Sequence, residues 1–187
     1  MMELTWLKNI KDAKMALTGT HKLMLLLFYD PNCSGCKKTF HSTLEDNIVR
    51  SLVDHLFAPV SLAVTSEQDM TARYAIEMTP TFIITDENLK ELERWVGYLP
   101  PEEFTSQVTL SYGLASMHLN KLREAENAFA WILDNNPNSD VAPQARYYLG
   151  VALYKETGDT QHLARTWESM NKRYPGNYWT KKASAWS

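Results

Sequence analysis

Short apolar runs in the first hundred residues indicate buried strands. Residues 23–29 (LMLLLFY) and 58–64 (APVSLAV) are continuous apolar runs of strand length, a pattern typical of strands that are covered on both faces. Residues 79–86 form a third run. The turn segment ENLK separates it from residues 91–98, which alternate between apolar and polar positions like an edge strand. We therefore expect four strands in this part of the chain.

Apolar residues at helical spacing lie before and between these strands. Residues 6–17 show this spacing ahead of the first strand. Residues 40–57 show it after that strand and predict a long amphipathic helix, either straight or kinked near its middle. Ser66 and Asp69 resemble a capping box, which would open a short helix that ends near Ile76.

The order of these elements predicts the architecture. Strand–helix–strand units favour parallel pairing of the early strands, whereas the short turn at 86–90 predicts one antiparallel pair. The expected fold class is α/β, with a small mixed sheet flanked by helices over about the first 105 residues.

From residue 101 onward no segment has the pattern of a strand. Pro100 and Pro101 mark the start of a helix, and four amphipathic segments follow at 101–120, 121–137, 139–158 and 159–175. These segments are similar to one another: Gly113 recurs as Gly150, 37 residues on, and Phe129 recurs as Trp167, 38 residues on. A period in this range with helix–turn–helix content predicts a helical repeat.

The composition is globular, and the charge argues against two classes of partner. Hydrophobic residues make up 44%, charged residues 22%, and the net charge is −3. Residues 1–106 carry a balance of −5 and residues 107–187 a balance of +2. This asymmetry suggests two units but is too small to favour nucleic acid or membrane binding.

The first thirty residues lack the pattern of a secretory signal or of a membrane span. Charged residues from Glu3 to Lys14 interrupt the apolar stretch that a signal peptide requires. The run at 23–29 is far shorter than the roughly 20 residues of a membrane helix. We therefore expect a cytoplasmic protein, in which thiols are kept reduced.

The only two cysteines, Cys33 and Cys36, stand shortly after the first predicted strand. Over residues 1–106 the chain resembles the thioredoxin superfamily. The strand leads into Cys-Ser-Gly-Cys, the segment YAIEMTPTFIITD is similar to the family's Thr-Pro-Thr signature, and WVGYLPPEEF is similar to its closing strand, glycine and final helix. The resemblance implies that Pro80 is cis and lies beside the cysteines, and that Thr79 pairs with a substrate's backbone like a strand edge.

The spacing of the two cysteines suits thiol–disulfide exchange. Residues three apart on a helix lie on one face, so the two sulfurs can bond to each other. A helix N-terminus favours the thiolate and lowers the pKa of a cysteine below its usual value of about 8.5, an effect to which Lys37 and Lys38 would add. We expect Cys33, the nearer to solvent, to be the nucleophile and Cys36 to be the resolving cysteine.

Several positions differ from thioredoxin itself. Asn32 replaces the Trp before the first cysteine, and Ser34-Gly35 replaces Gly-Pro between the two. Leu27 occupies the place of the buried acid that activates the second cysteine. Asp30 is the nearest carboxylate, and it either substitutes for that acid or caps the turn.

Two other interpretations of the cysteine pair stay open. Zinc prefers four ligands; with no second CxxC and five scattered histidines, only a site shared by two chains would supply them. The two thiols could instead be inert buried side chains. The sequence has no Gly-rich phosphate loop and no Ser/His/Asp arrangement in a recognisable context, so we expect no cofactor and no metal site.

Residues 107–187 resemble tetratricopeptide repeats, which implies an all-α annex with a concave face for a partner's peptide. Both repeats lack the consensus aromatic residue near their start, where Thr109 and Arg146 stand. A helix at 101–119 shared with the first domain predicts that the two domains form one rigid body. The positions expected to line the concave face are Gln107, Leu114, Met117, Gln144, Tyr147, Val151 and Tyr154.

These features predict a thiol–disulfide oxidoreductase. It would act on a protein disulfide, take electrons from a thiol-based donor and use its helical annex to dock a substrate or partner. The alternative is a non-catalytic adaptor, in which the thioredoxin-like domain is only the platform for an interaction module. Neither nucleic acid nor a membrane is an expected partner.

Overall fold

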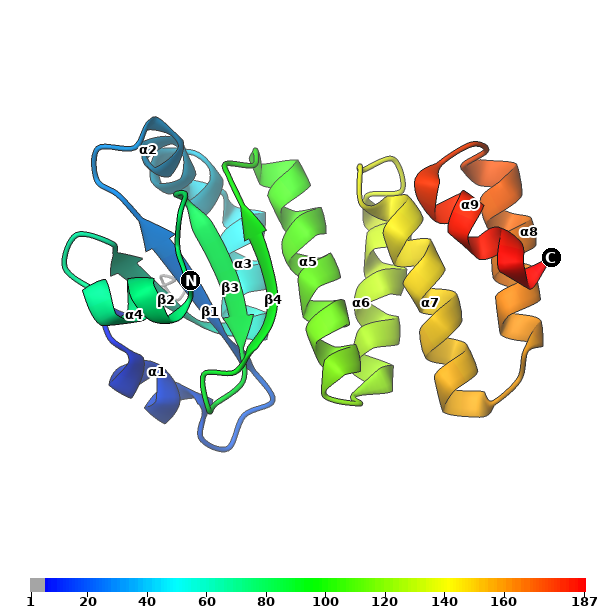
Figure 1. The fold of residues 1–187 in the computed structure, drawn as a ribbon, viewed down its shortest axis with the longest axis horizontal. Coiled ribbons are helices and arrows are strands. Elements are labelled where there is room, and N and C mark those ends of the chain that lie inside the picture. Colours follow the sequence, from blue (N-terminus) through cyan, green and yellow to red (C-terminus); the bar gives the residue numbers. More distant parts are fainter. Residues whose placement is uncertain (1–5) are drawn as a thin grey trace. The chain divides into compact units, whose positions relative to one another are not determined.

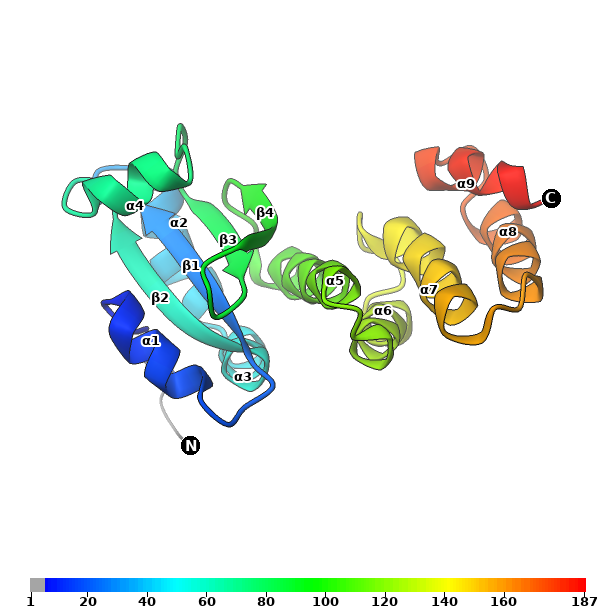
Figure 2. The ribbon, with the colours of Figure 1, turned by 60° about the horizontal axis from the view of Figure 1, so that its bottom comes forward.

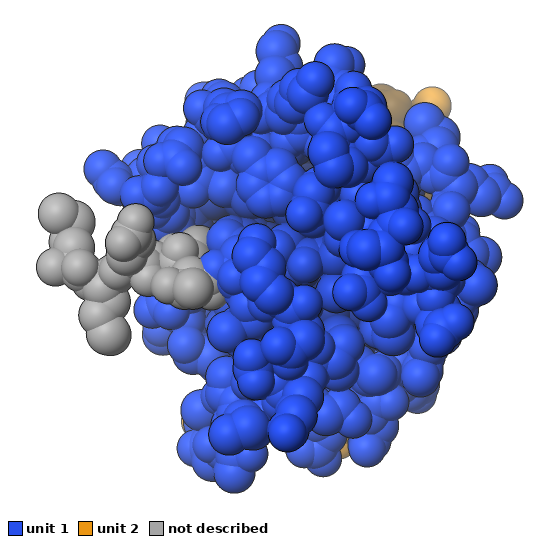
Figure 3. Space-filling model, turned by 90° about the vertical axis from the view of Figure 1, so that its left-hand side faces the viewer, with its two compact units in different colours: residues 1–105 blue, residues 106–187 orange. Residues whose placement is uncertain are grey.

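The structure is a computed structural model and describes residues 6–187. The chain divides into two compact units, residues 1–105 and residues 106–187 (Figure 3). We refer to them as unit 1 and unit 2 and describe each by itself.

Unit 1 is built on a four-stranded sheet with the strand order β2-β1-β3-β4 (Figure 1). The strands lie close to their predicted positions: β1 is Leu23–Tyr29, β2 is Phe57–Ala63, β3 is Thr81–Thr85 and β4 is Glu91–Val96. β1 pairs with β2 in parallel, which confirms the prediction for the first strand–helix–strand unit. β4 pairs antiparallel with β3 as the short turn predicts.

The direction of β3 differs from the prediction, because β3 runs antiparallel to β1 rather than parallel to the early strands. The connection from β2 includes α4, Gln68–Arg73, and it stays at the end of the sheet where β2 stops. Thr81, the first residue of β3, lies opposite Phe28 near the end of β1, so β3 runs back along β1.

The predicted long helix at 40–57 is interrupted. The chain forms α2 (Ser34–His41), a short 3-10 helix (Thr43–Glu45) and α3 (Asn47–Leu56). Asp46 starts α3 as its N-cap, because its side chain accepts hydrogen bonds from Ile48 N at 2.8 Å and Val49 N at 3.0 Å. The apolar spacing of a helix continues through this break, so the pattern allows a kink near the middle but does not divide the segment into separate helices.

The first predicted helix begins later than expected. α1 spans Ile10–Leu17 with Asn9 as its N-cap, and the residues before it are extended. Leu7 pairs with Val60 of β2: Leu7 N donates to Pro59 O at 2.9 Å, and Ser61 N donates to Leu7 O at 3.0 Å. The residues before Trp6 lie outside the described part of the chain.

The expected capping box at Ser66 is not formed. Glu67 is the N-cap of α4 and makes no capping hydrogen bond with its side chain. The Ser66 hydroxyl instead donates to Ala63 O at 3.3 Å, so it belongs to the turn that leaves β2.

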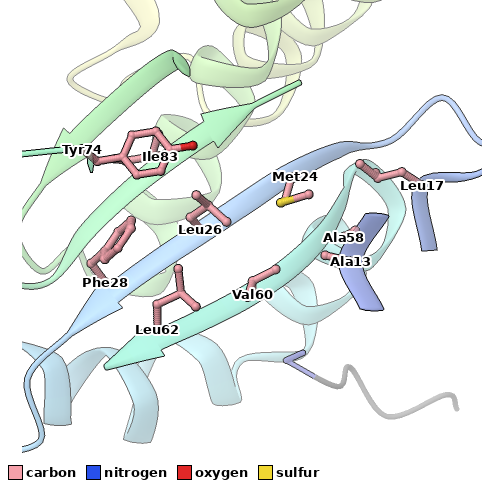
Figure 4. Packing of buried hydrophobic residues seen from close by; sticks show 10 residues of the cluster. All are labelled: Ala13, Leu17, Met24, Leu26, Phe28, Ala58, Val60, Leu62, Tyr74 and Ile83. Atoms are coloured by element: carbon pink, nitrogen blue, oxygen red, sulfur yellow. The ribbon is translucent and has the colours of Figure 1, made fainter. Parts of the chain in front are cut away.

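Both faces of the sheet are covered, as continuous apolar strands require. One face carries the buried cluster drawn in Figure 4, in which β1, β2 and β3 side chains pack against Ala13 and Leu17 of α1 and against Tyr74. α3 lies behind the sheet in Figure 1, on the side away from α1. On the edge of the sheet near β4, the Phe82 ring stacks on Trp95 at 4.7 Å and meets the ring of Phe104 at 5.2 Å.

Unit 2 is entirely helical among its described residues (Figure 2). α5 spans Pro101–His118, so it begins at the predicted proline and crosses the boundary between the units. The remaining helices are α6 (Leu122–Asn135), α7 (Ala142–Thr157), α8 (Gln161–Arg173), α9 (Tyr178–Ala183) and a final 3-10 turn, Ser184–Trp186. Within residues 6–187, no helix combines the length and apolar character needed to cross a membrane.

Two glycines allow neighbouring helices of unit 2 to approach closely. A Cβ at Gly113 of α5 would lie 2.5 Å from Cε1 of Phe129 on α6, and a Cβ at Gly150 of α7 would lie 2.8 Å from Cβ of Thr166 on α8. Both the glycines and their partners are 37 residues apart. The residue that packs where Phe129 packs is thus Thr166, one position before the Trp167 of the sequence comparison.

Candidate active site

The two cysteines lie where the chain leaves β1 and enters α2. Asp30 forms the turn: its side chain accepts from Asn32 N at 2.7 Å, and its carbonyl accepts from Cys33 N at 3.1 Å. The turn places Cys33 at the N-cap of α2, with an extended backbone (φ −71°, ψ 126°). Cys36 then lies one turn into the helix, as the spacing predicts.

The Cys33 sulfur is partly exposed and surrounded by hydrogen-bond donors. Cys36 N donates to Cys33 Sγ at 3.4 Å, and this backbone hydrogen bond is the largest cause that lowers the pKa of Cys33. The Thr79 side chain also lowers this pKa, while partial burial opposes the change. Lys38 Nζ lies 5.3 Å from the ring centre of Tyr98.

The segment before β3 lies beside Cys33, because β3 is the neighbour of β1 and starts where β1 ends. The Cys33 thiol donates to Thr79 O at 3.2 Å, and the Thr79–Pro80 peptide bond is cis. A Cβ at Gly35 would lie 3.3 Å from Cδ of Pro80 and 3.7 Å from Cys33 Sγ. Gly35 therefore leaves the space in which the helix N-terminus and Pro80 come together.

Cys36 has the opposite environment. Its side chain is 1% exposed, and burial is the largest cause that raises the pKa of its thiol, although hydrogen bonds from the Thr79 side chain and the Asp30 backbone lower it. The two sulfurs therefore differ in kind: one is accessible and stabilised as thiolate, and the other is buried and held as thiol.

The position of the expected buried acid is apolar. Leu27 is fully buried in β1, and the Asp30 carboxylate is engaged with the Asn32 backbone. Among the described residues, no three His, Cys, Asp or Glu side chains gather closely enough to hold a metal ion.

Tyr98 is a site residue that the sequence did not single out. The Cβ of Tyr98 lies 3.8 Å from where a Cβ at Gly35 would stand. Lys38 Nζ lies over the Tyr98 ring, 5.3 Å from its centre. The following residue is fixed to unit 1, because the buried Thr43 hydroxyl donates to Leu99 O at 2.6 Å. The available signal is the WVGYLPP segment, which contains Tyr98 and is part of the stretch that resembles the family's closing strand, glycine and final helix.

The seven positions expected on the concave face all belong to unit 2, and each is at least partly exposed. Gln107 Nε2 donates to Ser111 Oγ at 3.0 Å, within α5. Leu114 and Met117 pack at the border of the buried cluster around Phe129. Gln144 and Val151 lie on α7, where Tyr154 is 36% exposed.

Tyr147 differs from the other six positions because the C-terminal segment contacts its ring. The ring stacks on Trp186 at 4.6 Å and meets Trp179 at 5.2 Å. Lys182 Nζ lies 5.3 Å from the ring centre of Tyr147. These contacts reduce the surface that Tyr147 offers to a partner.

Comparison with known proteins places unit 1 in a family. The profile of the thioredoxin-like domain matches residues 10–110, more than half of the 187-residue chain, whereas no curated protein matches. Among solved structures, the chain is similar to a thioredoxin from Thermus thermophilus, with 26% identity over 57% of this chain and 85% of that chain and a TM-score of 0.49.

Two further solved structures are similar at lower identity. A DsbH oxidoreductase is 18% identical over 59% of this chain and 85% of that chain, with a TM-score of 0.49. A thioredoxin-fold protein from Helicobacter pylori is 17% identical over 72% of this chain and 86% of that chain, with a TM-score of 0.45. The matched residues 10–110 contain the sheet, both cysteines and Pro80, and the chain belongs to the thioredoxin-like domain family.

Proposed function

We propose that this protein is a thiol–disulfide oxidoreductase that acts on disulfide bonds of proteins through Cys33 and Cys36. The observation that carries the proposal is the difference between the two sulfurs. Cys33 is partly exposed and has a lowered pKa, whereas Cys36 is buried and has a raised pKa. A nucleophilic thiolate beside a protonated resolving thiol is the arrangement that dithiol exchange requires.

The reaction has two exchange steps. The Cys33 thiolate attacks one sulfur of a substrate disulfide, forming a mixed disulfide and releasing the other substrate sulfur as a thiolate. Cys36 then loses its proton and attacks Cys33 Sγ, which expels the second substrate sulfur as a thiolate that takes up a proton. The substrate disulfide gains two electrons, the Cys33–Cys36 pair becomes a disulfide, and a thiol-based donor reduces it again.

Thr79 and Pro80 are proposed to orient the substrate. The Thr79 carbonyl lies next to the nucleophilic sulfur, and a substrate segment in extended conformation could donate a backbone N–H to it, in the manner of an added strand. We place the reaction in the cytoplasm, where a thiol-based donor maintains the reduced pair.

Reduction of insulin by dithiothreitol, followed by turbidity, tests the activity. The wild-type chain should accelerate the reaction, and the Cys33→Ser and Cys36→Ser forms should each lose this acceleration. The matched control is the Cys33→Ser/Cys36→Ser double variant, checked by circular dichroism for an intact fold. Equal rates for the wild-type chain and the double variant would contradict an enzymatic role and would favour the non-catalytic adaptor.

We further propose that unit 2 is a tetratricopeptide-like pair of helical hairpins that docks the substrate or a partner. The repeated close contacts, Gly113 with Phe129 and Gly150 with Thr166, support two structurally equivalent hairpins with a 37-residue period. In a Cys36→Ser background that accumulates mixed disulfides, substitution of Gln144 and Tyr154 by Ala should reduce the amount of trapped client. Trapping that is unaffected by these substitutions would assign substrate selection to unit 1.

A further inference from the structure

A depression in unit 1 reaches Cys36 without including the residues around the exposed sulfur. It has a volume of about 560 Å³ and is bordered by α2, the end of β1 and the residues that precede α1. Cys36 belongs to its lining, whereas Cys33, Thr79 and Pro80 do not. The resolving cysteine therefore has a second approach, separate from the one that a substrate would occupy.

A fixed cation lies in the wall of this depression. Lys8 lines it, and Lys8 Nζ donates to the hydroxyl of the buried Ser61 at 3.1 Å. The Lys8 backbone follows Leu7, which is paired with β2. Two attachments thus hold the ammonium group at the depression, one through the backbone and one through the side chain.

Ser61 lies beside Leu27 in the sheet. It is the β2 partner of Leu27 on β1, and neighbouring residues of a parallel pair point to the same face. Leu27 is the apolar residue at the position where a buried acid was expected. The Lys8–Ser61 pair therefore brings a polar, charged group to the part of the fold that lacks a carboxylate.

Cys36 must lose a proton before it can attack the mixed disulfide, because the thiolate is the nucleophile. Its side chain is 1% exposed, and a substrate bound to Cys33 would cover the Thr79 side of the site. The depression is then the side from which water can reach the Cys36 sulfur.

We propose that this depression is the route by which the Cys36 proton leaves during resolution, and that the Lys8 ammonium, held by Ser61, favours the Cys36 thiolate. The inference rests on the proposed function, and it assigns to Lys8 an electrostatic role in the step in which Cys36 resolves the mixed disulfide. In the step, the Cys36 S–H proton passes to a water in the depression, and the thiolate attacks Cys33 Sγ. The departing substrate thiolate then takes up a proton from solvent, so that protons balance.

Other charged side chains also line the depression. They are Lys37 and His41 on α2, Asp30 after β1, and Glu45 of the 3-10 helix. Asp30 is the competing candidate, because a carboxylate could accept the proton directly. Its carboxylate accepts from Asn32 N at 2.7 Å, whereas the Lys8 ammonium is held in the wall of the depression by Ser61, and we assign the electrostatic role to Lys8.

The test separates the two exchange steps with 4,4′-dithiodipyridine, a neutral disulfide that releases one coloured thiopyridone at each step. The first release reports attack by Cys33, and the second reports resolution by Cys36. With the full chain at neutral pH, Lys8→Met should slow the second release about three- to tenfold, as expected for loss of a nearby cation in a partly exposed site. Its pH profile should move to higher pH, and the first release should be unchanged.

Three comparisons make the assignment specific. Lys8→Arg should restore the second release, Ser61→Ala should slow it in part, and Lys14→Met, a change to an exposed lysine of α1 outside the depression, should have no effect. In 1 M salt the difference between the wild-type chain and Lys8→Met should shrink, because the Debye length falls to about 3 Å.

Two results would overturn the inference while leaving the proposed function in place. One is a normal first release with a second release that Lys8→Met does not change. The other is a second release slowed by Asp30→Asn and not by Lys8→Met, which would make Asp30 the proton acceptor. A first release no faster than that of free cysteine would instead contradict the proposed function itself.

Discussion

The sulfur of Cys33 lies 3.2 Å from the carbonyl oxygen of Thr79, a residue 46 positions later in the chain. This contact joins the N-terminus of α2 to the segment that enters β3. Because the same sulfur also accepts from Cys36 N, both elements determine its reactivity. The reactivity of the Cys33 thiol therefore depends on its contacts with both α2 and the segment before β3.

Alkylation of Cys33 is expected to reach half its maximal rate below the pKa of about 8.5 of an unperturbed thiol, because the Cys36 N–H favours the thiolate. The measurement is the rate of iodoacetamide labelling against pH in the Cys36→Ser form, which keeps the backbone donor and leaves a single thiol. Free cysteine under the same conditions is the control. Coincident profiles for the two would contradict the stabilised thiolate.

Substitution of Gly113 or Gly150 by Ala should destabilise unit 2. Each new methyl group would meet a buried side chain on the next helix, Phe129 or Thr166. Overpacking of this kind costs about 1–3 kcal/mol, which exceeds or offsets the roughly 1 kcal/mol that Ala gains over Gly in a helix. Urea unfolding followed by circular dichroism measures the change.

These two substitutions also have an internal control. The rate of Cys33 labelling should stay unchanged in both variants, since neither glycine lies in unit 1. An Ala variant at either position that is more stable than the wild-type chain would show that the helices can separate without cost.

Glu126→Gln should remove a pH dependence of stability. The pKa of Glu126 is raised to about 7 by burial and by its hydrogen bond to Glu156, against 4.5 for an ordinary glutamate. The folded state therefore binds a proton that the unfolded state releases between about pH 4.5 and pH 7. The free energy of unfolding falls as the pH rises through this window and is then constant.

Thermal melts at pH 5, 6, 7 and 8 test this expectation. The wild-type melting temperature should decrease across the series, and that of Glu126→Gln should decrease less, because the amide does not titrate. The lowered pKa of Glu156 acts below pH 4.5 and does not enter this range. Glu168→Gln, at an exposed position of α8, is the matched control and should follow the wild-type chain.

Phe104→Ala should be among the most damaging single changes in unit 1. Phe104 is 1% exposed and packs edge-to-face on Phe82 at 5.2 Å and on Trp95 at 5.9 Å. Removal of a buried Phe side chain costs about 3–5 kcal/mol. Urea unfolding should show this loss, and Phe104→Leu should recover part of it. A loss below about 1 kcal/mol would mean that the first turn of α5 does not close the core.

The strands and the cysteine site could be predicted from the sequence because their signals are local. Apolar runs at Leu23–Tyr29 and Phe57–Ala63 are continuous, and Cys33 and Cys36 lie within one helical turn. The sequence also pointed to Thr79 as a neighbour of Cys33 through a resemblance, not through spacing. No local pattern joins residues 46 positions apart.

The features that were missed depend on contacts that a periodic pattern does not encode. The break between α2 and α3 is set by the Asp46 cap, while the apolar spacing runs on through it. The direction of β3 depends on the end of the sheet at which the connection containing α4 stays, and no local pattern encodes that end. The spacing of Leu7 is typical of a helix. In the structure its backbone instead pairs with Pro59 and Ser61 of β2, and these hydrogen bonds would be lost if α1 extended to Leu7.

The pairing of Leu7 with β2 also bears on how the protein avoids self-association. A strand at the border of a sheet offers unpaired N–H and C=O groups to any other chain, and such borders initiate aggregation. The backbone of Leu7 forms hydrogen bonds with the Pro59 carbonyl and the Ser61 amide at the middle of β2. A peptide strand from another molecule would have to displace this segment before it could pair with β2, so the few residues that carry Lys8 also protect this border of the sheet.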